Sequence, residues 1–143
     1  MTLNLSGVHK TLLLPLWSRA KLTLEGNSIL LDPKAVEIVK GMQYDFDLID
    51  RYLPFTSHAM NLGRARMFDY AIIRFLTDYP RASVANLGAG LDTTFSRVDN
   101  GSLTWYDIDL PDVIQLRKQL IPDTERSRCV SSPLGENRGS NCR

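Results

Sequence analysis

Two glycines stand where the chain needs to turn sharply and could approach a ligand closely. Gly88 and Gly90 lie between the short run 83–87, which has the character of a buried strand, and a segment with helical spacing. Ligands of open parallel sheets bind at the carboxyl ends of the strands, and the first crossover is the usual place. Glycine tolerates backbone angles that other residues avoid, and it has no Cβ to obstruct a ligand. Taken alone, the Gly-x-Gly pair is equally well explained by a tight strand-to-helix turn.

Two acids strengthen the case for a ligand at this turn. Asp107 and Asp109 lie at the end of the next predicted strand, about twenty residues after the glycines. An acid at this place can accept hydrogen bonds from the two hydroxyl groups of an adenosine ribose. For Asp109 the competing explanation is capping of a helix that begins at Pro111. Because a carboxylate has two oxygens, the two roles do not fully exclude each other.

The residues of the turn also discriminate between adenosine cofactors. A dinucleotide fingerprint has the pattern Gly-x-Gly-x-x-Gly and places a phosphate at the helix N-terminus, but Thr93 stands in place of the third glycine. Asp92 puts a negative charge where a pyrophosphate would sit, which disfavours NAD. S-adenosylmethionine carries no phosphate and has a positive sulfonium, so it tolerates this acid. An acid is also common at a helix start without any ligand.

The periodicity of apolar residues predicts the elements that position the turn. Asp32 followed by Pro33 is typical of a helix start, and the spacing that follows predicts a helix ending near Gly41. Residues 1–31 show no sustained period. A longer helix is predicted over 59–79 and is ended by a proline. Its broad apolar stripe consists of Met60, Met67, Phe68, Ala71, Ile72, Phe75, Leu76 and Tyr79.

Strands and helices alternate in the second half of the chain. Strands are predicted over 83–87, 103–108 and 128–131, with helical segments over 91–98 and 111–121 between them. This order predicts a parallel sheet with crossover helices.

Composition narrows the classes of function. The chain has 143 residues, a formal net charge of +1 and 43% hydrophobic residues, as expected of one ordinary globular domain. The charge balance gives no reason to expect nucleic acid or a membrane surface as a partner, and the apolar run 12–16 is too short to span a bilayer. Cys129 and Cys142 fit no zinc or redox spacing. We therefore expect free thiols, no metal and a cytoplasmic location.

At these residues the sequence resembles a known family. The string Leu87-Gly-Ala-Gly-Leu-Asp-Thr93, followed by Tyr106-Asp-Ile-Asp-Leu-Pro111, is similar to the leucine carboxyl methyltransferase family. The upstream segments 13–21, 31–36 and 64–69 resemble its prokaryotic branch, which contains O-methyltransferases linked to polyketide-type products. The resemblance runs from about residue 10 to residue 134. It implies an α/β, Rossmann-like fold that binds S-adenosylmethionine.

The resemblance also carries over cofactor-binding residues. The family's N-terminal lysine falls at Lys21, and the arginine that grips the methionine carboxylate falls at Arg64. The first loop glycine falls at Gly88, with Gly90 beside it, and the ribose-binding acid falls at Asp109. An arginine can form a bidentate pair with a carboxylate, which supports the role of Arg64.

Three other residues receive no cofactor role. Arg66 lies two positions after Arg64 on the predicted helix, so it faces elsewhere. The histidines His9 and His58 have no acid or nucleophile at a suggestive spacing, and we expect them at the surface or in caps.

The family pattern divides the chain into three parts. Residues 1–80 are expected to form N-terminal helices that contribute to the cofactor site, and residues 81–134 to form the first part of the Rossmann-like domain, with about three parallel strands. Residues 135–143 depart from the family and are expected to be a flexible tail. We expect a truncated copy whose sheet has an unpaired edge, which could lead to self-association.

Two functional hypotheses follow from the sequence. The first is an S-adenosylmethionine-dependent O-methyltransferase that acts on a small-molecule or peptide-carboxylate acceptor. The alternative is a non-catalytic module that retains S-adenosylmethionine affinity or binds a partner. No catalytic residue is assigned, because the acceptor pocket of the family belongs to a later part of the sequence.

Overall fold

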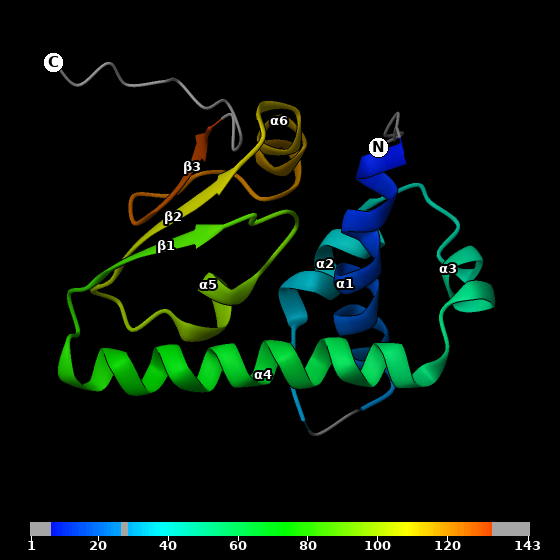
Figure 1. The fold of residues 1–143 in the computed structure, drawn as a ribbon, viewed down its shortest axis with the longest axis horizontal. Helices are drawn as coiled ribbons and strands as arrows, with labels where there is room; N and C mark the ends of the chain where they lie inside the picture. The colour runs from blue at the N-terminus through cyan, green and yellow to red at the C-terminus, as the bar shows by residue number, and fades with distance from the viewer. Residues whose placement is uncertain (1–6, 27–28, 133–143) are drawn as a thin grey trace, which may run out of the picture.

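The computed structural model of the chain describes residues 7–26 and 29–132. Their elements follow one another in the order α1 (Gly7–Leu24), α2 (Pro33–Gly41), α3 (Asp47–Tyr52), α4 (Phe55–Asp78), β1 (Ser83–Leu87), α5 (Thr94–Val98), β2 (Thr104–Asp109), α6 (Pro111–Leu120) and β3 (Ser127–Ser131). Helix α4 runs along both the sheet and the N-terminal helices, and thereby connects the two parts of the molecule (Figure 1).

The strands form one parallel sheet in the order β1-β2-β3. This confirms the α/β fold with three parallel strands, and each strand begins and ends within one residue of its predicted bounds. The register aligns Leu87 of β1, Ile108 of β2 and Val130 of β3 in one row across the sheet. Parallel pairing brings the carboxyl ends of β1 and β2 to the same edge, so the glycine turn and the acids meet there.

Helix α2 follows the sequence prediction closely. The side chain of Asp32 accepts a hydrogen bond from the backbone N–H of Ala35 at 2.9 Å, and Pro33 occupies the first turn. Asp32 therefore acts as the N-cap, and the helix ends at Gly41 as expected.

The periodicity of apolar residues did not predict helix α1. It spans Gly7–Leu24 and contains Pro15. Its residues are buried on more than one side: Leu13, Leu16 and Ala20 pack into one cluster, while Leu22 packs into another. A helix enclosed by several neighbours has no wide polar face, so its sequence shows no amphipathic stripe.

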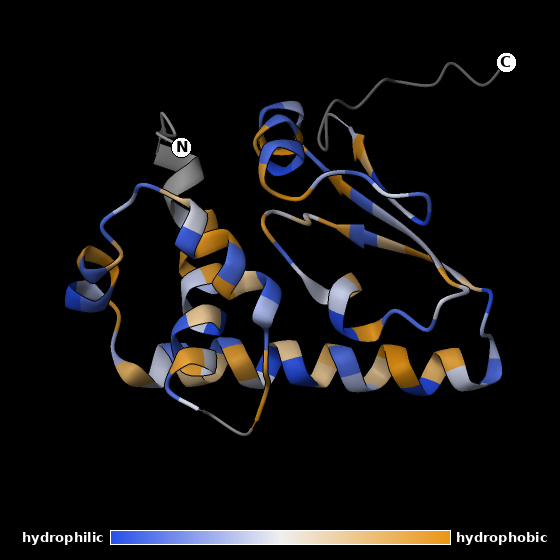
Figure 2. Ribbon diagram, turned by 180° about the vertical axis from the view of Figure 1, so that it is seen from behind, coloured by the Kyte–Doolittle hydropathy of each residue, from blue (hydrophilic) through white to orange (hydrophobic). Residues whose placement is uncertain are grey.

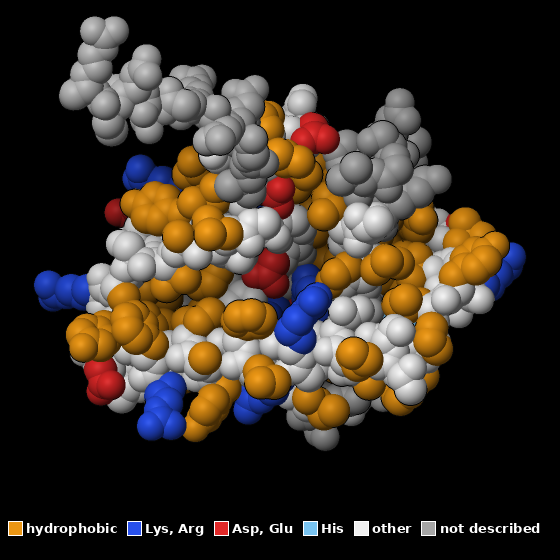
Figure 3. All heavy atoms as spheres, in the orientation of Figure 1, with side chains coloured by type: hydrophobic (Ala, Val, Ile, Leu, Met, Phe, Trp, Pro, Cys, Tyr) orange, Lys and Arg blue, Asp and Glu red, His pale blue; other side chains and the backbone are white. Residues whose placement is uncertain are grey.

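Helix α4 begins four residues earlier than predicted and buries a different face. Much of the predicted stripe is exposed, including Met60, Met67 and Phe68. The buried residues of the helix are His58, Leu62, Asp69 and Leu76. Apolar residues recur along the helix on its outer surface as well (Figures 2 and 3). The stripe therefore marks a surface that the described residues leave uncovered, apart from Ile72 and Leu76, which pack against β1 and β2 residues.

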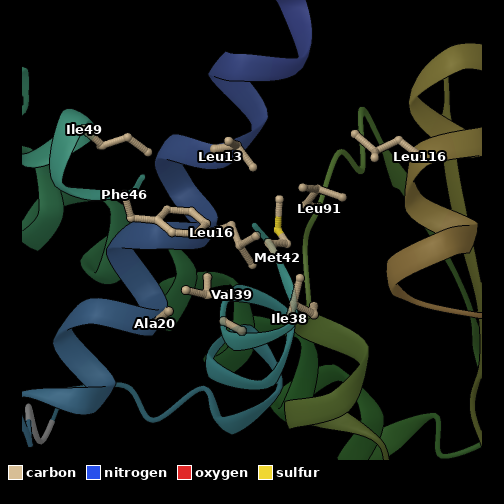
Figure 4. Packing of buried hydrophobic residues seen from close by; sticks show 11 residues of the cluster. Leu13, Leu16, Ala20, Ile38, Val39, Met42, Phe46, Ile49, Leu91 and Leu116 are labelled. Carbon is tan, nitrogen blue, oxygen red and sulfur yellow. The ribbon is translucent and has the colours of Figure 1, made fainter. Parts of the chain in front are cut away.

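A hydrophobic cluster joins the helical part to the sheet part. It includes Leu13 and Leu16 of α1, together with residues of α2 and α3. Leu91 from the glycine turn and Leu116 from α6 reach into the same cluster (Figure 4). Because this core crosses the boundary predicted near residue 80, the glycine turn is packed directly against the N-terminal helices.

Among the described residues, one face of the sheet lacks a covering element, and both of its edge strands, β1 and β3, pair only with β2. Side chains of β2 such as Trp105 and Asp107 are buried on one face. On the other face Leu87 is 68% exposed and Val130 is 41% exposed. Strand β1 pairs only with β2. Parallel sheets are normally covered on both faces and paired on both sides.

None of the helices described is both long and apolar enough to cross a membrane. The predicted tail, residues 135–143, lies outside the described residues.

The exposed edge and face generate a prediction about association. We expect the isolated chain to self-associate, because an unpaired apolar edge strand readily pairs with another chain. Leu87→Lys should reduce the association by placing a charge on β1. Met60→Lys removes an apolar side chain that is equally exposed but lies on α4, so it should have little effect. Size-exclusion chromatography with light scattering measures all three proteins; a monomeric wild type with a cooperative thermal transition would contradict the prediction.

Candidate functional site

The glycine turn leaves β1 and passes over the end of β2. The backbone N–H groups of Gly88 and Ala89 both donate to the carbonyl oxygen of Ile108, at 2.8 and 3.2 Å. Gly88 has φ +66° and Gly90 has φ +49°, which are left-handed conformations that favour glycine. A Cβ at Gly90 would also lie 3.1 Å from the side chain of Leu12, whereas a Cβ at Gly88 would meet nothing within 4 Å.

Two buried arginines hold the carbonyl groups of the turn. Arg117 of α6 donates from Nη1 to the carbonyl oxygens of Gly90 and Asp92, at 3.0 and 2.7 Å. Arg19 of α1 donates from Nη2 to the carbonyl oxygen of Leu91 at 3.0 Å. Three consecutive carbonyl groups that have no helix or strand partner are thereby satisfied, and the backbone of the turn is held from two sides.

Each of these arginines is paired with a buried acid. Arg117 Nη2 lies 2.6 Å from Asp107 Oδ2, and Asp107 also accepts hydrogen bonds from Asn86 and from the indole of Trp105. Arg19 Nε lies 2.9 Å from Asp32 Oδ2. The oxygens of Asp107 are therefore occupied by protein groups beneath the turn.

A second ionic group extends the pairing of Arg19 to α4 and α5. Arg97 of α5 donates to Asp32 at 2.6 Å and to both oxygens of Asp69, at 2.7 and 2.9 Å. Asp32 thus joins α1, α2 and α5, while Asp69 joins α4 to α5. Burial of these charges is tolerable because each carboxylate faces a guanidinium.

The turn, α1 and α4 together enclose a cavity of about 470 Å³. Figure 3 shows a hollow in this face, with acidic and basic side chains close together. The polar and charged lining residues are Arg19 of α1, Asn61 and Arg64 of α4, Asn86 of β1, Asp92 of the turn and Thr94 at the start of α5. Apolar lining includes Leu12, Phe68, Ile72, Leu91 and Trp105.

Asp92 gives the cavity a negative charge. Burial alone would raise the pKa of its carboxyl group, but the charge of Arg19 and hydrogen bonds from Thr94 outweigh burial and hold that pKa below its usual range. The carboxylate is therefore ionised at neutral pH. It accepts from the backbone N–H and hydroxyl of Thr94, at 3.1 and 3.0 Å, so it also stabilises the start of α5.

The structure brings together three of the five residues predicted for the cofactor. Arg64, Gly88 and Gly90 all line the cavity. Asp109 lies beside them without lining it: its Oδ2 accepts from the backbone N–H of Gly90 at 2.7 Å, and its Oδ1 accepts from that of Leu110. The N-cap of α6 is Leu110, with no side-chain cap bond, so Asp109 does not cap that helix in the usual way.

Lys21 lies apart from the other predicted residues. Its ammonium group contacts Asp50 at 2.8 Å and Glu25 at 3.2 Å, and it lies over the ring of Trp17. Lys21 does not line the cavity, whereas Arg19, two positions earlier, does. The cofactor role of Lys21 stays a prediction.

The sequence analysis did not identify the residues that contact the turn from distant positions in the chain. No spacing in the sequence connects Arg19 or Arg117 with the glycine turn, because these contacts cross 72 and 27 positions along the chain. Asn61 could have been noticed only by its position three residues before Arg64, on the same side of a helix.

A family model for leucine carboxyl methyltransferase matches residues 19–131 of this chain. The chain belongs to the leucine carboxyl methyltransferase family. This confirms the resemblance found in the sequence, and the matched range contains the glycine turn, both buried arginines and every polar residue of the cavity. The α/β fold with its parallel strands agrees with the Rossmann-like fold of that family.

Two curated proteins are similar to this chain over most of its length. The first is the tetracenomycin polyketide synthesis O-methyltransferase TcmP of Streptomyces glaucescens, 36% identical over 136 residues, which is 93% of this chain and 49% of the relative. The second is the S-adenosyl-L-methionine-dependent methyltransferase dpfgK of Gibberella zeae, 30% identical over 134 residues, 87% of this chain and 45% of the relative. The chain therefore spans about half the length of these relatives. No solved structure matches the chain significantly.

The two acids at the end of β2 should respond differently to substitution. Asp107→Ala leaves Arg117 buried without its partner, and we expect it to lower the free energy of unfolding by about 3–5 kcal/mol. Asp109→Ala should cost less stability, because Asp109 pairs with backbone N–H groups. The predicted role of Asp109 implies instead that this variant weakens binding of S-adenosylmethionine by about 1.5–3 kcal/mol, through loss of hydrogen bonds to the ribose.

Urea unfolding and calorimetric titration of both variants measure the two effects. A larger loss of cofactor affinity in a folded Asp107→Ala protein than in Asp109→Ala would contradict the assignment of Asp109.

The lowered pKa of Asp92 predicts a pH-dependent contribution to stability. Its stabilising effect is complete above the unfolded-state value of about 3.9 and is lost as the pH falls through the lower folded-state pKa. We therefore expect the wild type to exceed Asp92→Asn in free energy of unfolding at about pH 7, and the difference to shrink towards about pH 3. A difference that stays constant over this range in urea titrations would show that the ionised carboxylate is not the stabilising form.

Proposed function

We propose that this chain binds S-adenosylmethionine in the cavity and contributes that site to an O-methyltransferase. The observation that carries the proposal is the meeting of Arg64 with Gly88 and Gly90 around one cavity, from segments far apart in the sequence. The names of both curated relatives support it, since one is an O-methyltransferase and the other is S-adenosyl-L-methionine-dependent.

The residues of the cavity fit the chemistry of this cofactor. Arg64 is exposed at the cavity and can take the cofactor's carboxylate in a bidentate pair. The ionised Asp92 favours the positive sulfonium of the cofactor, and it opposes a pyrophosphate. Gly88 faces open space where a Cβ would otherwise project. Asp109 keeps free lone pairs on both carboxylate oxygens for ribose hydroxyls, because each accepts one backbone hydrogen bond.

S-adenosylmethionine supplies an activated methyl group on its sulfonium, for transfer to an oxygen atom. What this chain's residues contribute is position: Arg64 would hold the carboxylate of the cofactor and Asp109 its ribose, while Arg19 and Arg117 hold the backbone of the turn between them. We propose a small-molecule or peptide-carboxylate acceptor, and the name of TcmP supports a polyketide. A carboxylate acceptor needs no base, whereas a hydroxyl acceptor does.

The second candidate is a binding module without catalysis. The chain spans about half the length of the curated relatives. Methyl transfer from labelled S-adenosylmethionine to a polyketide phenol separates the two candidates, since both bind the cofactor. A cytoplasmic location remains an expectation from the cysteine spacing.

The role of Arg64 leads to a test of the proposed site. Arg64→Lys keeps the positive charge but loses the planar fork, so we expect it to weaken S-adenosylhomocysteine binding about tenfold. Arg66→Lys is the matched control, because Arg66 is exposed on the same helix and does not line the cavity. Calorimetric titration measures the affinity of each protein for S-adenosylhomocysteine. Equal affinities for Arg64→Lys and wild type would contradict the proposed role of Arg64.

A further inference from the structure

A line of polar side chains runs from α3 through the interface of α1 and α4 to the cavity. Asp50 Oδ1 lies 3.3 Å from His58 Nε2, and His58 Nδ1 lies 2.9 Å from Ser18 Oγ. Asn61 donates from Nδ2 to Ser18 Oγ at 3.0 Å, and its Oδ1 accepts a long contact of 3.4 Å from Arg64 Nη2. We call these five residues the polar line.

The sequence prediction for His58 was wrong, and the error reveals the polar line. His58 was expected at the surface, but only 2% of it is exposed, and Ser18 is fully buried. The burial of polar side chains is costly unless they are hydrogen-bonded. Helices α1 and α4 pack so that Ser18 contacts both His58 and Asn61. The interface therefore fixes the positions of these polar side chains. His9 has a side chain outside the described residues.

The hydrogen bonds made by the Ser18 hydroxyl group determine which way the amide of Asn61 points. When the His58 proton lies on Nε2, which is 3.3 Å from Asp50 Oδ1 but makes no hydrogen bond within the described part of the chain, the Ser18 hydroxyl donates to Nδ1. When Nδ1 carries a proton, it donates to Ser18 Oγ, and the hydroxyl donates to the carbonyl oxygen of Leu14, 2.8 Å away. In both arrangements the hydroxyl proton is used elsewhere, and Ser18 Oγ accepts from Asn61.

The amide of Asn61 is therefore oriented at both ends. Its NH₂ group faces Ser18, and its carbonyl oxygen faces Arg64. Rotation of the amide by half a turn would place two donors against the guanidinium, and it would require the Ser18 hydroxyl to give up its bond to His58 or Leu14. Amide orientations are assigned from such networks, and here both neighbours favour the same one.

We propose that the oriented carbonyl oxygen of Asn61 binds the α-ammonium group of S-adenosylmethionine beside the carboxylate held by Arg64; this rests on the proposed function. The cofactor carries its ammonium and carboxylate groups on one carbon atom. Asn61 and Arg64 offer an acceptor and a cationic donor three positions apart on α4, where side chains are neighbours. Both line the cavity.

The existing contact between Asn61 and Arg64 does not oppose this binding. At 3.4 Å it is longer than an ordinary N–H···O hydrogen bond, so a ligand displaces it at little cost. Ser18 and His58 lie too deep to touch a ligand. They are positioning residues, which act by keeping the amide oxygen of Asn61 directed into the cavity.

Selectivity for the amino group tests the proposal. The probes are S-adenosylhomocysteine and its desamino analogue, in which hydrogen replaces the α-amino group, both titrated calorimetrically into the full chain. We expect the wild type to bind S-adenosylhomocysteine about 10- to 100-fold more tightly than the analogue, as for a hydrogen bond to a charged group. Asn61→Leu, which has a similar shape, should lose this preference, so that the ratio of the two affinities approaches one.

A second variant tests the positioning role. Ser18→Ala retains Asn61 but frees its amide to rotate, so we expect part of the preference to be lost, with unchanged affinity for the desamino analogue. A merely structural defect would instead weaken both ligands alike. Arg64→Lys serves as the matched control, because it should weaken both ligands by the same factor and leave the amino-group preference intact.

Each outcome decides the question. Equal wild-type affinities for the two ligands would overturn the proposal while leaving the cofactor site standing, and this result needs no variant to fold. Retention of the full preference by Asn61→Leu would do the same. Failure of the wild type to bind S-adenosylhomocysteine would overturn the proposed function itself, and the role of Asn61 with it.

Discussion

The glycine turn keeps its shape because two buried arginines satisfy its carbonyl groups. A turn that leaves a sheet edge has peptide groups without helix or strand partners, and buried peptide groups need partners of some kind. Arg19 and Arg117 supply them for three successive carbonyls, from opposite sides of the turn. Their own charges are balanced by Asp32 and Asp107, which are themselves buried. The cavity exists where the turn is held in this way.

These ion pairs also decide how the helical part is attached to the sheet part. Asp32 is the N-cap of α2 and at the same time the partner of Arg19 on α1 and Arg97 on α5. One carboxylate thus joins a helix start, a second helix and the helix that follows the glycine turn. Removal of one member of such a group leaves an uncompensated buried charge, so the elements are coupled through it. The hydrophobic cluster that takes in Leu91 and Leu116 completes the attachment.

Several apolar surfaces remain uncovered by the described residues. The row formed by Leu87, Ile108 and Val130, the free edge of β1 and the outer residues of α4 are apolar surfaces without a neighbour among the described residues. The cavity opens beside the same edge, at the carboxyl end of β1. The curated relatives, which are about twice as long, have the chain length to cover such surfaces.

Local patterns in the sequence were sufficient for the strands, for α2 and for the glycine turn. Each of these depends on neighbours along the chain: strand length, an N-cap followed by proline, and glycines with positive φ. The family resemblance added Arg64 and Asp109. Helix α1, the buried face of α4 and the positions of Arg19, Asn61 and His58 depended on the tertiary structure. A helix enclosed on several sides shows no stripe, and a polar residue buried against a partner far along the chain has the same local sequence as an exposed one. Contacts between segments far apart in the sequence therefore place Arg19 at the glycine turn. Lys21, two positions later, lies on another side of α1, where it pairs with Asp50.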